Sequence, residues 1–565
     1  MRGILLFALL MFSTLVMAQQ PNYRPPLDGT LRLSGNFGEV RSNHFHTGLD
    51  LKTDGAEGKP VRAIADGAIV RVVVSPTGYG KALYIEHPDG RTSVYAHLRE
   101  FSKEVQAYVK QQQYLEKKFG VDLTIPASMF KVKQGDVIAK SGNSGGSGGP
   151  HLHFELRETA NQMTLNPLEY GFKVADNRGP EMERLWLYTH SKNGQVDGIA
   201  PERAFELEID GLSYRLKSTL PIHGNGAISV GIAALDRFSD SDNACGIYSM
   251  TVSVNGKSIH RHTLHEVAFD KKRKVNAHID FDKRVRNGAI VHRSYIAPAN
   301  DLKLYDAITN RGMFMVEHGK LYAIRIDLKD YAGNVSSLKF SIKGALRQGD
   351  KVLSASATTD VFYPQRDNNF SNGDVRVSIP TGCLYDTVAF RYAMKPACAD
   401  CFSPIHSLHD RYTAMEDYMT VAMRIHPFKG VNTKQLLIVS FDKNGEPVAE
   451  GGTVIGPWIS TKTRSFGDYA VMRDSLAPEL RPKNFTQTTS VARIDTLLFF
   501  LRDDLAGIAS YTATLNGQWV LLEHDPKNNL LYYVKDERFM AGQNTLRIAT
   551  TDKVGNIKEL NLTLQ

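Results

Sequence analysis

The sequence predicts a mainly β protein: a small antiparallel β-sheet domain with one inserted helix, followed by tandem β-sandwich domains. Short apolar runs between Gly, Pro and Asn turns recur along most of the chain, which is the pattern of β-hairpins. A helical period appears in one early segment only. The chain of 565 residues is also too long for one compact domain, since domains of about 100–150 residues are the most common.

Composition excludes several classes of protein. The hydrophobic fraction of 42% is close to the globular average, which argues against wholesale disorder. Only 4 Cys are present, so a disulfide scaffold is excluded. The mean hydropathy of −0.28 excludes a polytopic membrane protein. The net charge of +8 is diffuse, and its densest run, at 270–274, is typical of a solvated surface, with glycan or lipid binding as the minority interpretation. No basic-aromatic module predicts a nucleic-acid partner.

Residues 1–18 have the features of a cleavable signal peptide. Arg2 precedes an apolar stretch over 4–18 that ends in small residues. A membrane-spanning helix would need about 20 apolar residues, so an uncleaved anchor is the less favoured alternative. The absence of a Cys near the end of this stretch argues against a lipoprotein. We therefore expect export to the periplasm or cell envelope, with secretion as the alternative, and no stable membrane span after cleavage.

The first predicted domain covers residues 19–179. Turn-bounded strands are expected at 69–74, 82–87 and 92–98, a further strand set over 130–140, and a strand over 151–157 directly after the glycine-rich loop 141–150. A helix is expected over 102–119, with Ser102 as its cap and Gly120 as its end. Its apolar stripe consists of Phe101, Val105, Tyr108, Leu115 and Phe119.

The remainder reads as three β units: an Ig-like sandwich over 180–345, a β-rich middle domain over 346–482 and a second Ig-like sandwich over 483–565. A weak repeat supports the two sandwiches. Gly-Ile leads to an Asn-Gly turn at 246–256 and again at 507–517, and Asp-x-x-Gly-Asn follows at 330–334 and 552–556. Cys398 and Cys401 are expected to form a disulfide after export, while Cys245 and Cys383 either pair or remain buried thiols.

Histidine and aspartate gather in three segments of the first domain. On a strand, residues two apart share a face, so His151 and His153 point one way while Leu152, Phe154 and Leu156 point into the core. His46 and Asp50 are four apart, but Gly48 between them disfavours a helix. We therefore place this pair on a loop that enters a strand, with Phe45, Leu49 and Leu51 packed inward. His97 lies at the end of another predicted strand.

These residue types suit a catalytic zinc, which keeps three protein ligands and one open position. His46, Asp50, His97, His151 and His153 supply three ligands and two further imidazoles for proton transfer and oxyanion stabilisation. Each motif alone is weak evidence. His44 is the nearest competing ligand and is interpreted as a pocket-rim residue, and His87 is interpreted as structural. The glycine-rich loop lacks the Gly-Lys-Ser/Thr ending of a phosphate-binding loop.

In their order and context, these segments resemble a known family. Residues 36–171 are similar to the lysostaphin/LytM-type zinc endopeptidases of peptidoglycan (metallopeptidase family 23). The resemblance implies a small antiparallel, barrel-sandwich-like β domain with a groove across its sheet. It implies Zn2+ bound by His46, Asp50 and His153, with His97 and His151 lining the catalytic site. The matching segments are 36–38, 46–51, 65–67, 95–98, 135–139, 142–145 and 149–155.

The resemblance also implies a function: hydrolysis of peptide bonds in peptidoglycan stem peptides or crossbridges by attack of a metal-bound water. Two alternatives stay open, a non-catalytic envelope adaptor or activator with a structural zinc and an endopeptidase that acts on an envelope protein. The intact set of five residues argues against the adaptor. The C-terminal β domains are candidates for contacting an envelope protein. The connection from Leu98 to Gly135 is longer than the family's, and we favour a helix that covers a sheet edge over a lid.

Overall fold

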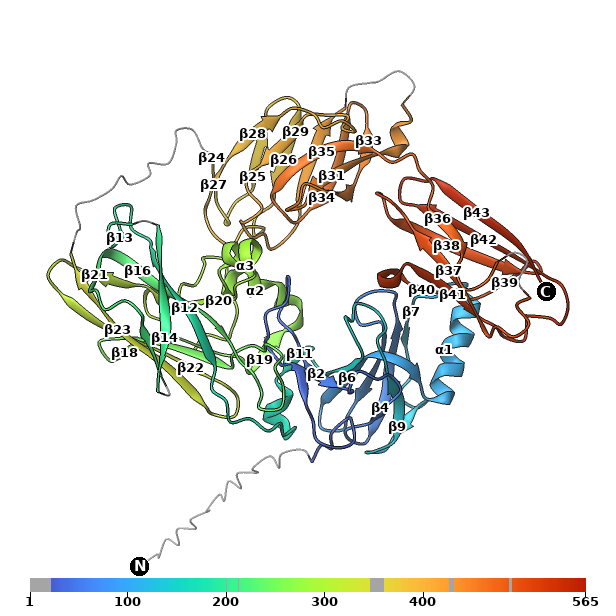
Figure 1. The fold of residues 1–565 in the computed structure, drawn as a ribbon, viewed down its shortest axis with the longest axis horizontal. Helices are drawn as coiled ribbons and strands as arrows, with labels where there is room; N and C mark the ends of the chain where they lie inside the picture. Colours follow the sequence, from blue (N-terminus) through green and yellow to red (C-terminus); the bar gives the residue numbers. More distant parts are fainter. Residues whose placement is uncertain (1–21, 200, 212, 346–359, 426–430, 487–489) are drawn as a thin grey trace, which may run out of the picture.

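The computed structural model describes residues 22–565 except 200, 212, 346–359, 426–430 and 487–489. The predicted signal peptide, 1–18, lies outside the described residues. The prediction of a mainly β protein is confirmed, because strands dominate every part of the described chain (Figure 1). None of the helices within the described ranges is long and apolar enough to cross a membrane.

The N-terminal domain is built on one antiparallel sheet of 12 strands, whose main path runs β1-β2-β10-β6-β5-β4-β7. The predicted strands at 69–74, 82–87, 92–98 and 151–157 correspond to β4, β5, β6 and β10, and their ends differ by at most three residues. The strands are β1 Leu33–Gly35, β2 Leu49–Lys52, β3 Pro60–Arg62, β4 Gly67–Val74, β5 Lys81–Glu86, β6 Arg91–Phe101, β7 Val121–Thr124, β8 Lys131–Val132, β9 Val137–Ser141, β10 His151–Glu158, β11 Met163–Leu165 and β19 Glu266–Ala268. A short 3-10 helix, Pro167–Tyr170, follows β11.

Helix α1 (Lys103–Glu116) corresponds to the predicted helix, and two details of the prediction were wrong. Ser102 is the N-cap residue as predicted, although its side chain makes no capping hydrogen bond. The helix ends at Glu116 rather than just before Gly120, because Lys117 adopts a left-handed conformation. Leu115 is 69% exposed, whereas Val105, Val109 and Gln113 are buried. Leu115 is ten residues after Val105 and is therefore turned about 80° away from it around a helix of 3.6 residues per turn.

The second β unit is an 11-stranded sheet with its own apolar core, but part of it packs on the N-terminal domain. Leu264 and Val267 belong to the N-terminal core, and β19 pairs with β11. Two short helices, α2 (Val275–His278) and α3 (Phe281–Asn287), lie in this segment. The strands are β12 Glu181–Thr189, β13 Gln195–Val196, β14 Glu202–Asp210, β15 Ser213–Leu216, β16 Ile222–Leu235, β17 Ser249–Val254, β18 Lys257–Thr263, β20 Val291–Arg293, β21 Phe314–Val316, β22 Leu321–Lys329 and β23 Val335–Gly344.

The third unit has two five-stranded sheets around one core and a two-stranded sheet, β24 with β27. One five-stranded sheet runs β25-β26-β30-β34-β33 and the other β28-β29-β35-β31-β32. The strands are β24 Asp360–Phe362, β25 Asn368–Ser371, β26 Val375–Ile379, β27 Val388–Phe390, β28 Tyr392–Lys395, β29 Ile405–Leu408, β30 Met419–Arg424, β31 Leu436–Phe441, β32 Pro447–Gly451, β33 Thr453–Ile455, β34 Trp458–Thr463 and β35 Gly467–Arg473.

The C-terminal unit is a sandwich of two four-stranded sheets, β36-β37-β41-β40 and β39-β38-β42-β43, which share one apolar core. The predicted domain boundaries and the Ig-like assignment stay predictions. The strands are β36 Glu479–Pro482, β37 Thr496–Arg502, β38 Ile508–Leu515, β39 Gln518–Trp519, β40 Glu523–Asp525, β41 Leu530–Val534, β42 Asn544–Asp552 and β43 Ile557–Leu564.

The sequence repeat has a structural basis in the second and the C-terminal β units. The Asn-Gly turns at 255–256 and 516–517 join β17 to β18 and β38 to β39. The carboxylates of Asp330 and Asp552 each accept a hydrogen bond from the backbone N–H of the Asn four residues later. Cys398 and Cys401 form the expected disulfide, and Cys245 and Cys383 are separate buried thiols.

The C-terminal unit returns to the N-terminal domain and lies against α1 (Figure 1). Lys81 Nζ forms an ion pair with Glu523 Oε2 at 3.0 Å, and Asp536 accepts a hydrogen bond from Tyr114 on α1. The Trp519 ring packs edge-on against Tyr114, with 5.1 Å between ring centroids. The helix thus packs one face on the N-terminal core and offers another to the C-terminal unit.

Candidate functional site

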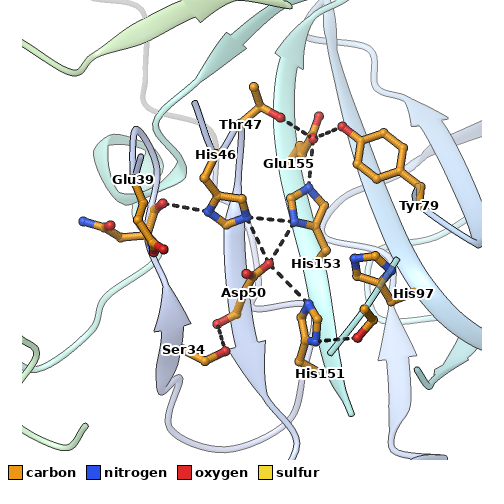
Figure 2. Close-up of polar contacts among 12 residues, drawn as sticks. Ser34, Glu39, His46, Thr47, Asp50, Tyr79, His97, His151, His153 and Glu155 are labelled. Carbon is orange, nitrogen blue, oxygen red and sulfur yellow. Dashed lines mark hydrogen bonds and ion pairs between the residues drawn. The ribbon is translucent and has the colours of Figure 1, made fainter. Parts of the chain in front are cut away.

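Strand register brings the first and last predicted segments together. In the antiparallel pair of β2 and β10, Asp50 lies directly opposite His153, and opposed residues project from the same face of a sheet. His153 Nδ1 is 2.9 Å from Asp50 Oδ1, and His46 Nε2 is 3.0 Å from both of these atoms (Figure 2). All three residues are buried. The structure therefore gathers two nitrogens and one oxygen at a single point.

The opposite nitrogen of each imidazole is fixed by a group that can only accept a hydrogen bond. His46 Nδ1 lies 2.7 Å from the carbonyl oxygen of Asn36, so Nδ1 carries the proton. His153 Nε2 lies 2.9 Å from Glu155 Oε1 and donates in the same way. In the neutral rings, His46 Nε2 and His153 Nδ1 consequently keep their lone pairs. Such outer hydrogen bonds are the usual means of orienting metal-binding histidines.

Asp50 is held as an anion. Its second oxygen accepts a hydrogen bond from Arg41 at 2.7 Å. Burial alone would raise the pKa of Asp50, but the neighbouring imidazole of His46, with those of His151 and His153, holds it well below its usual range. The group therefore keeps a negative charge that is available to a cation at neutral pH.

Glu155 holds the ring of His153 on the side opposite Asp50. Its side chain is fully buried and accepts hydrogen bonds from His153, Thr47 Oγ1 at 2.7 Å and Tyr79 (Figure 2). Arg157 Nε donates to its other oxygen at 2.6 Å. Burial would raise the pKa of Glu155, but Arg157 and His153 lower it. Removing one partner of a buried ion pair is strongly destabilising, because the remaining charge is left without solvent or a counter-charge.

His151 and His97 flank these three groups with both Nε2 atoms unprotonated. His151 Nδ1 donates to the Gly149 carbonyl at 2.8 Å, and His97 Nδ1 donates to the Ser144 carbonyl at 2.9 Å. Their rings are 4.8 Å apart, and His151 Nε2 is 3.4 Å from Asp50 Oδ1. Burial, with His153 and His151 adding to it, lowers the pKa of His97 to about 3, so this imidazole is neutral.

The backbone at His97 is unusual. Its φ is +58°, a left-handed conformation that few non-glycine residues adopt. The pairing of β6 with both neighbours shifts register beside it, between Lys81 and Leu83 on β5 and between Leu98 and Glu100 on β6 itself. Bulges of this kind re-aim side chains next to active sites. The backbone N–H of His97 is satisfied by the Tyr79 carbonyl at 2.9 Å.

The glycine-rich loop is a fixed support for both histidines. Ser144 Oγ donates to the Leu98 carbonyl at 2.8 Å and accepts from the Lys81 N–H at 2.9 Å. Gly145 has φ of +69°, and a Cβ there would lie 2.3 Å from the Gly80 nitrogen, so only glycine fits. Lys527 of the C-terminal unit donates to the Ser147 carbonyl at 3.0 Å and to Asn143 Oδ1 at 3.1 Å. Residues of the N-terminal domain and of the C-terminal unit thus hold the same loop in place.

We expect Lys527→Ala to loosen this loop. Lys527 is exposed, and such contacts are worth about 0.2–1 kcal/mol, so the amide exchange rate of Gly146 should rise by a factor of up to about five. Hydrogen exchange followed by mass spectrometry measures this. Lys558→Ala, at an exposed lysine on β43, is the control and should leave the loop unchanged. Equal exchange in both variants would contradict the bracing role.

The structure brings all five predicted residues into one cluster. His44 is exposed and is not part of the three-residue donor group, while His87 is buried with hydrogen bonds to the Asp66 carbonyl and Ser93 Oγ. Sequence reasoning missed Glu155, Arg41 and Asn36. The signal for Glu155 was present, because it continues the alternation of His151 and His153 on one face of β10. Arg41 and Asn36 lie in turns, and no local sequence pattern predicts that these turns come close to the site.

The donor set fits zinc. Two imidazole nitrogens with free lone pairs and one carboxylate oxygen are ligand types that zinc takes, and three protein ligands leave an open position. Their oriented tautomers and the buried anionic partners behind them are the outer shell that such a site needs. Calcium and magnesium prefer oxygen donors, so this nitrogen-rich set favours a transition metal.

This fold and donor set are of the metallopeptidase type, and comparison with known proteins identifies the family. Residues 44–117 and 128–167 match the model of peptidase family M23, so the N-terminal domain is a peptidase family M23 domain. The unmatched stretch, 118–127, includes β7, whereas α1 lies within the matched range. Residues 359–474 match a Zu5-like domain, which places this similarity in the third β unit.

The curated relatives match about a quarter of this chain, and the matched stretch spans a third or less of their own length. The DD-carboxypeptidase/endopeptidase Mpg of Neisseria meningitidis is 32% identical over 142 residues, which are 24% of this chain and 26% of the relative. The murein hydrolase activator NlpD of Salmonella dublin is 32% identical over 158 residues, 28% of this chain and 33% of the relative. Among solved structures, the catalytic domain of the M23 protein EnpA from Enterococcus faecalis aligns at 26% identity over 26% of this chain and 98% of that one, with a TM-score of 0.20.

Proposed function

We propose that this protein is a zinc-dependent endopeptidase that hydrolyses peptide bonds in peptidoglycan stem peptides or crossbridges. The observation that carries the proposal is the convergence of His46 Nε2, Asp50 Oδ1 and His153 Nδ1 on one point, beside the imidazoles of His97 and His151. Similarity supports peptidoglycan as the substrate, because two relatives are named as a DD-carboxypeptidase/endopeptidase and a murein hydrolase activator.

Zinc held by His46, Asp50 and His153 would polarise a peptide carbonyl and make a water molecule more acidic. The protein's own contribution starts with His97 and His151. Both present an unprotonated Nε2 next to the donor group, so either can accept a proton from the attacking water. Once protonated, the same nitrogen becomes a donor that can stabilise the developing oxyanion or protonate the leaving amine.

The two imidazoles are not equivalent in their surroundings. His151 Nε2 lies 3.4 Å from the Asp50 carboxylate, which stabilises a proton gained there. His97 is buried among other imidazoles, which oppose a positive charge on it. We therefore assign His151 as the primary proton acceptor and His97 as the hydrogen-bonding partner of the substrate carbonyl. We further propose that the protein acts after export, in the periplasm or cell envelope.

The test is digestion of purified peptidoglycan followed by mass spectrometry of the soluble fragments. Zinc-loaded protein should release peptides or cut crosslinked muropeptides, chelated protein should release none, and added zinc should restore the products. The mass of each product names the bond. If zinc-loaded protein releases nothing but increases the products of an added cell-wall hydrolase, the chain is an activator and the proposal is wrong.

A further inference from the structure

A second group of histidines lies in the second β unit, outside the site described above. His262 is on β18, His278 ends α2 and His292 is on β20. One ring nitrogen from each lies within 4.8 Å of the others, and none of the three side chains is more than 2% exposed. We propose that His262, His278 and His292 bind a divalent transition metal of the zinc class.

The fold places these three residues together for structural reasons. His262 and His260 share the inward face of β18, with Arg261 between them facing solvent. His292 forms an isolated bridge with Ile279, the residue that follows His278, so α2 and β20 deliver their histidines side by side. The cluster therefore draws on three separate elements, which a metal would cross-link.

The Nδ1 atoms of His262 and His278 each have a hydrogen-bonding partner: His262 Nδ1 is 3.0 Å from His260 Nε2, and His278 Nδ1 is 3.0 Å from the Tyr305 hydroxyl. In the tautomer in which Nδ1 donates, Nε2 of the same ring keeps its lone pair. His262 Nε2 is buried and has no hydrogen-bond partner among the described residues. Because buried polar atoms are nearly always satisfied, an orphaned imidazole nitrogen needs an explanation, and a bound metal ion supplies one.

The remaining pair of nitrogens has the spacing of metal ligands. His278 Nε2 faces His292 Nδ1 at 3.5 Å, the outer limit of a hydrogen bond. A tetrahedral zinc with Zn–N bonds of about 2.0–2.1 Å places two ligand nitrogens about 3.3–3.4 Å apart. The observed separation therefore suits two lone pairs directed at one ion better than a donor with an acceptor.

The charge state of the cluster also suits a cation. Burial, reinforced by neighbouring imidazoles, holds the pKa of His262 and His278 well below the ordinary value, and burial lowers the pKa of His292 to about 4. All three rings are neutral at physiological pH. Nitrogen donors without a carboxylate favour zinc, copper, nickel or cobalt over calcium or magnesium. His260 serves as the outer hydrogen-bonding partner of His262.

The site lies close to the M23 domain. The ring of Phe45 packs against His278, with 5.5 Å between centroids, and Phe45 directly precedes His46. The Phe45 N–H donates to the Lys272 carbonyl just before α2 at 2.9 Å. A metal that fixes α2 would therefore also fix the packing of the second unit on the M23 domain, so its role is structural.

The test uses the full chain with the substitution His153→Ala, which removes one of the three proposed ligands of the first site. The protein is stripped with a chelator, loaded with Zn2+, desalted and analysed for metal. We expect two zinc ions per chain in the wild type, one in His153→Ala and none in His153→Ala with His278→Gln. Cobalt(II) should give a tetrahedral visible spectrum in His153→Ala that His278→Gln removes. His190→Gln, at an exposed histidine of the same unit, is the control.

Two outcomes overturn the proposal. One is a folded His153→Ala chain that retains no zinc and gives no cobalt spectrum. The other is a bound ion that His278→Gln leaves in place. Because the first outcome needs no variant of the cluster itself, a failure of His278→Gln to fold does not protect the proposal. Bound zinc should also raise the melting temperature of His153→Ala, which a cluster that merely fills the core would not do.

Discussion

His153→Ala is expected to abolish zinc binding at the first site and to reduce peptide hydrolysis by about 10³-fold or more. Loss of an outer hydrogen-bonding partner alone costs about 10–100-fold in metal affinity, and this variant removes a proposed ligand itself. The fold should persist, because Glu155 keeps its hydrogen bonds from Thr47 and Arg157. The measurements are zinc content, release of muropeptides and the circular dichroism spectrum.

The matched control for this experiment is His44→Ala. His44 is two residues before His46 and is exposed, and it was the nearest competing ligand in the sequence. It should keep both zinc and activity. If His44→Ala lost zinc while His153→Ala kept it, the proposed ligand set would be wrong. If both His44→Ala and His153→Ala kept zinc at the first site, metal binding would not depend on His153, even if hydrolysis were lost.

Glu155→Gln is expected to have the second largest effect, on both stability and metal binding. It neutralises a carboxylate with no exposed surface and leaves the buried Arg157 guanidinium without its counter-charge. Breaking a buried ion pair in this way costs about 3–5 kcal/mol of unfolding free energy. The weakened acceptor at His153 Nε2 should also lower zinc affinity by about 10–100-fold.

Urea unfolding and competition with a zinc chelator measure these two quantities separately. Glu158→Gln is the control, because Glu158 is on the same strand but is partly exposed and pairs with Arg91 at 3.8 Å only. Its effect on stability should stay within about 0.5 kcal/mol. A Glu155→Gln protein as stable as Glu158→Gln would contradict the structural role of the buried pair.

Much of the M23 domain was predictable because β-strands have a period of two. Alternation alone placed His151 and His153 on one face of β10, and the same rule applied one step further would have included Glu155. Arg41 was not predictable, because its contact with Asp50 depends on the path of a turn. Leu115 was misplaced because every apolar residue of the segment was assigned to one helical face, although it lies away from Val105 and Val109.

Long-range contacts were the least predictable part of the structure. No local pattern relates His262 to His278 and His292, since β19, a 3-10 helix, α2 and α3 lie along the chain between His262 and His292. The contact of Tyr114 with Asp536 joins residues 422 positions apart. Hydrophobic period and turn signals determine local elements, whereas the pairing of distant surfaces depends on how complete domains meet.

The contact between Lys527 and the glycine-rich loop has a consequence for the order of folding. It joins residues 384 and 380 positions apart, so it forms only after the intervening β units have been made. Domains generally fold in turn from the N-terminus during synthesis. The M23 domain should therefore reach its native strand pairing while Asn143 and Ser147 still lack the contact with Lys527, and the loop should tighten in a late step. Pulsed hydrogen exchange during refolding would then find the amides of β10 protected before that of Gly146. Maturation of the site would thus be timed by the arrival of a domain that contributes no residue to it.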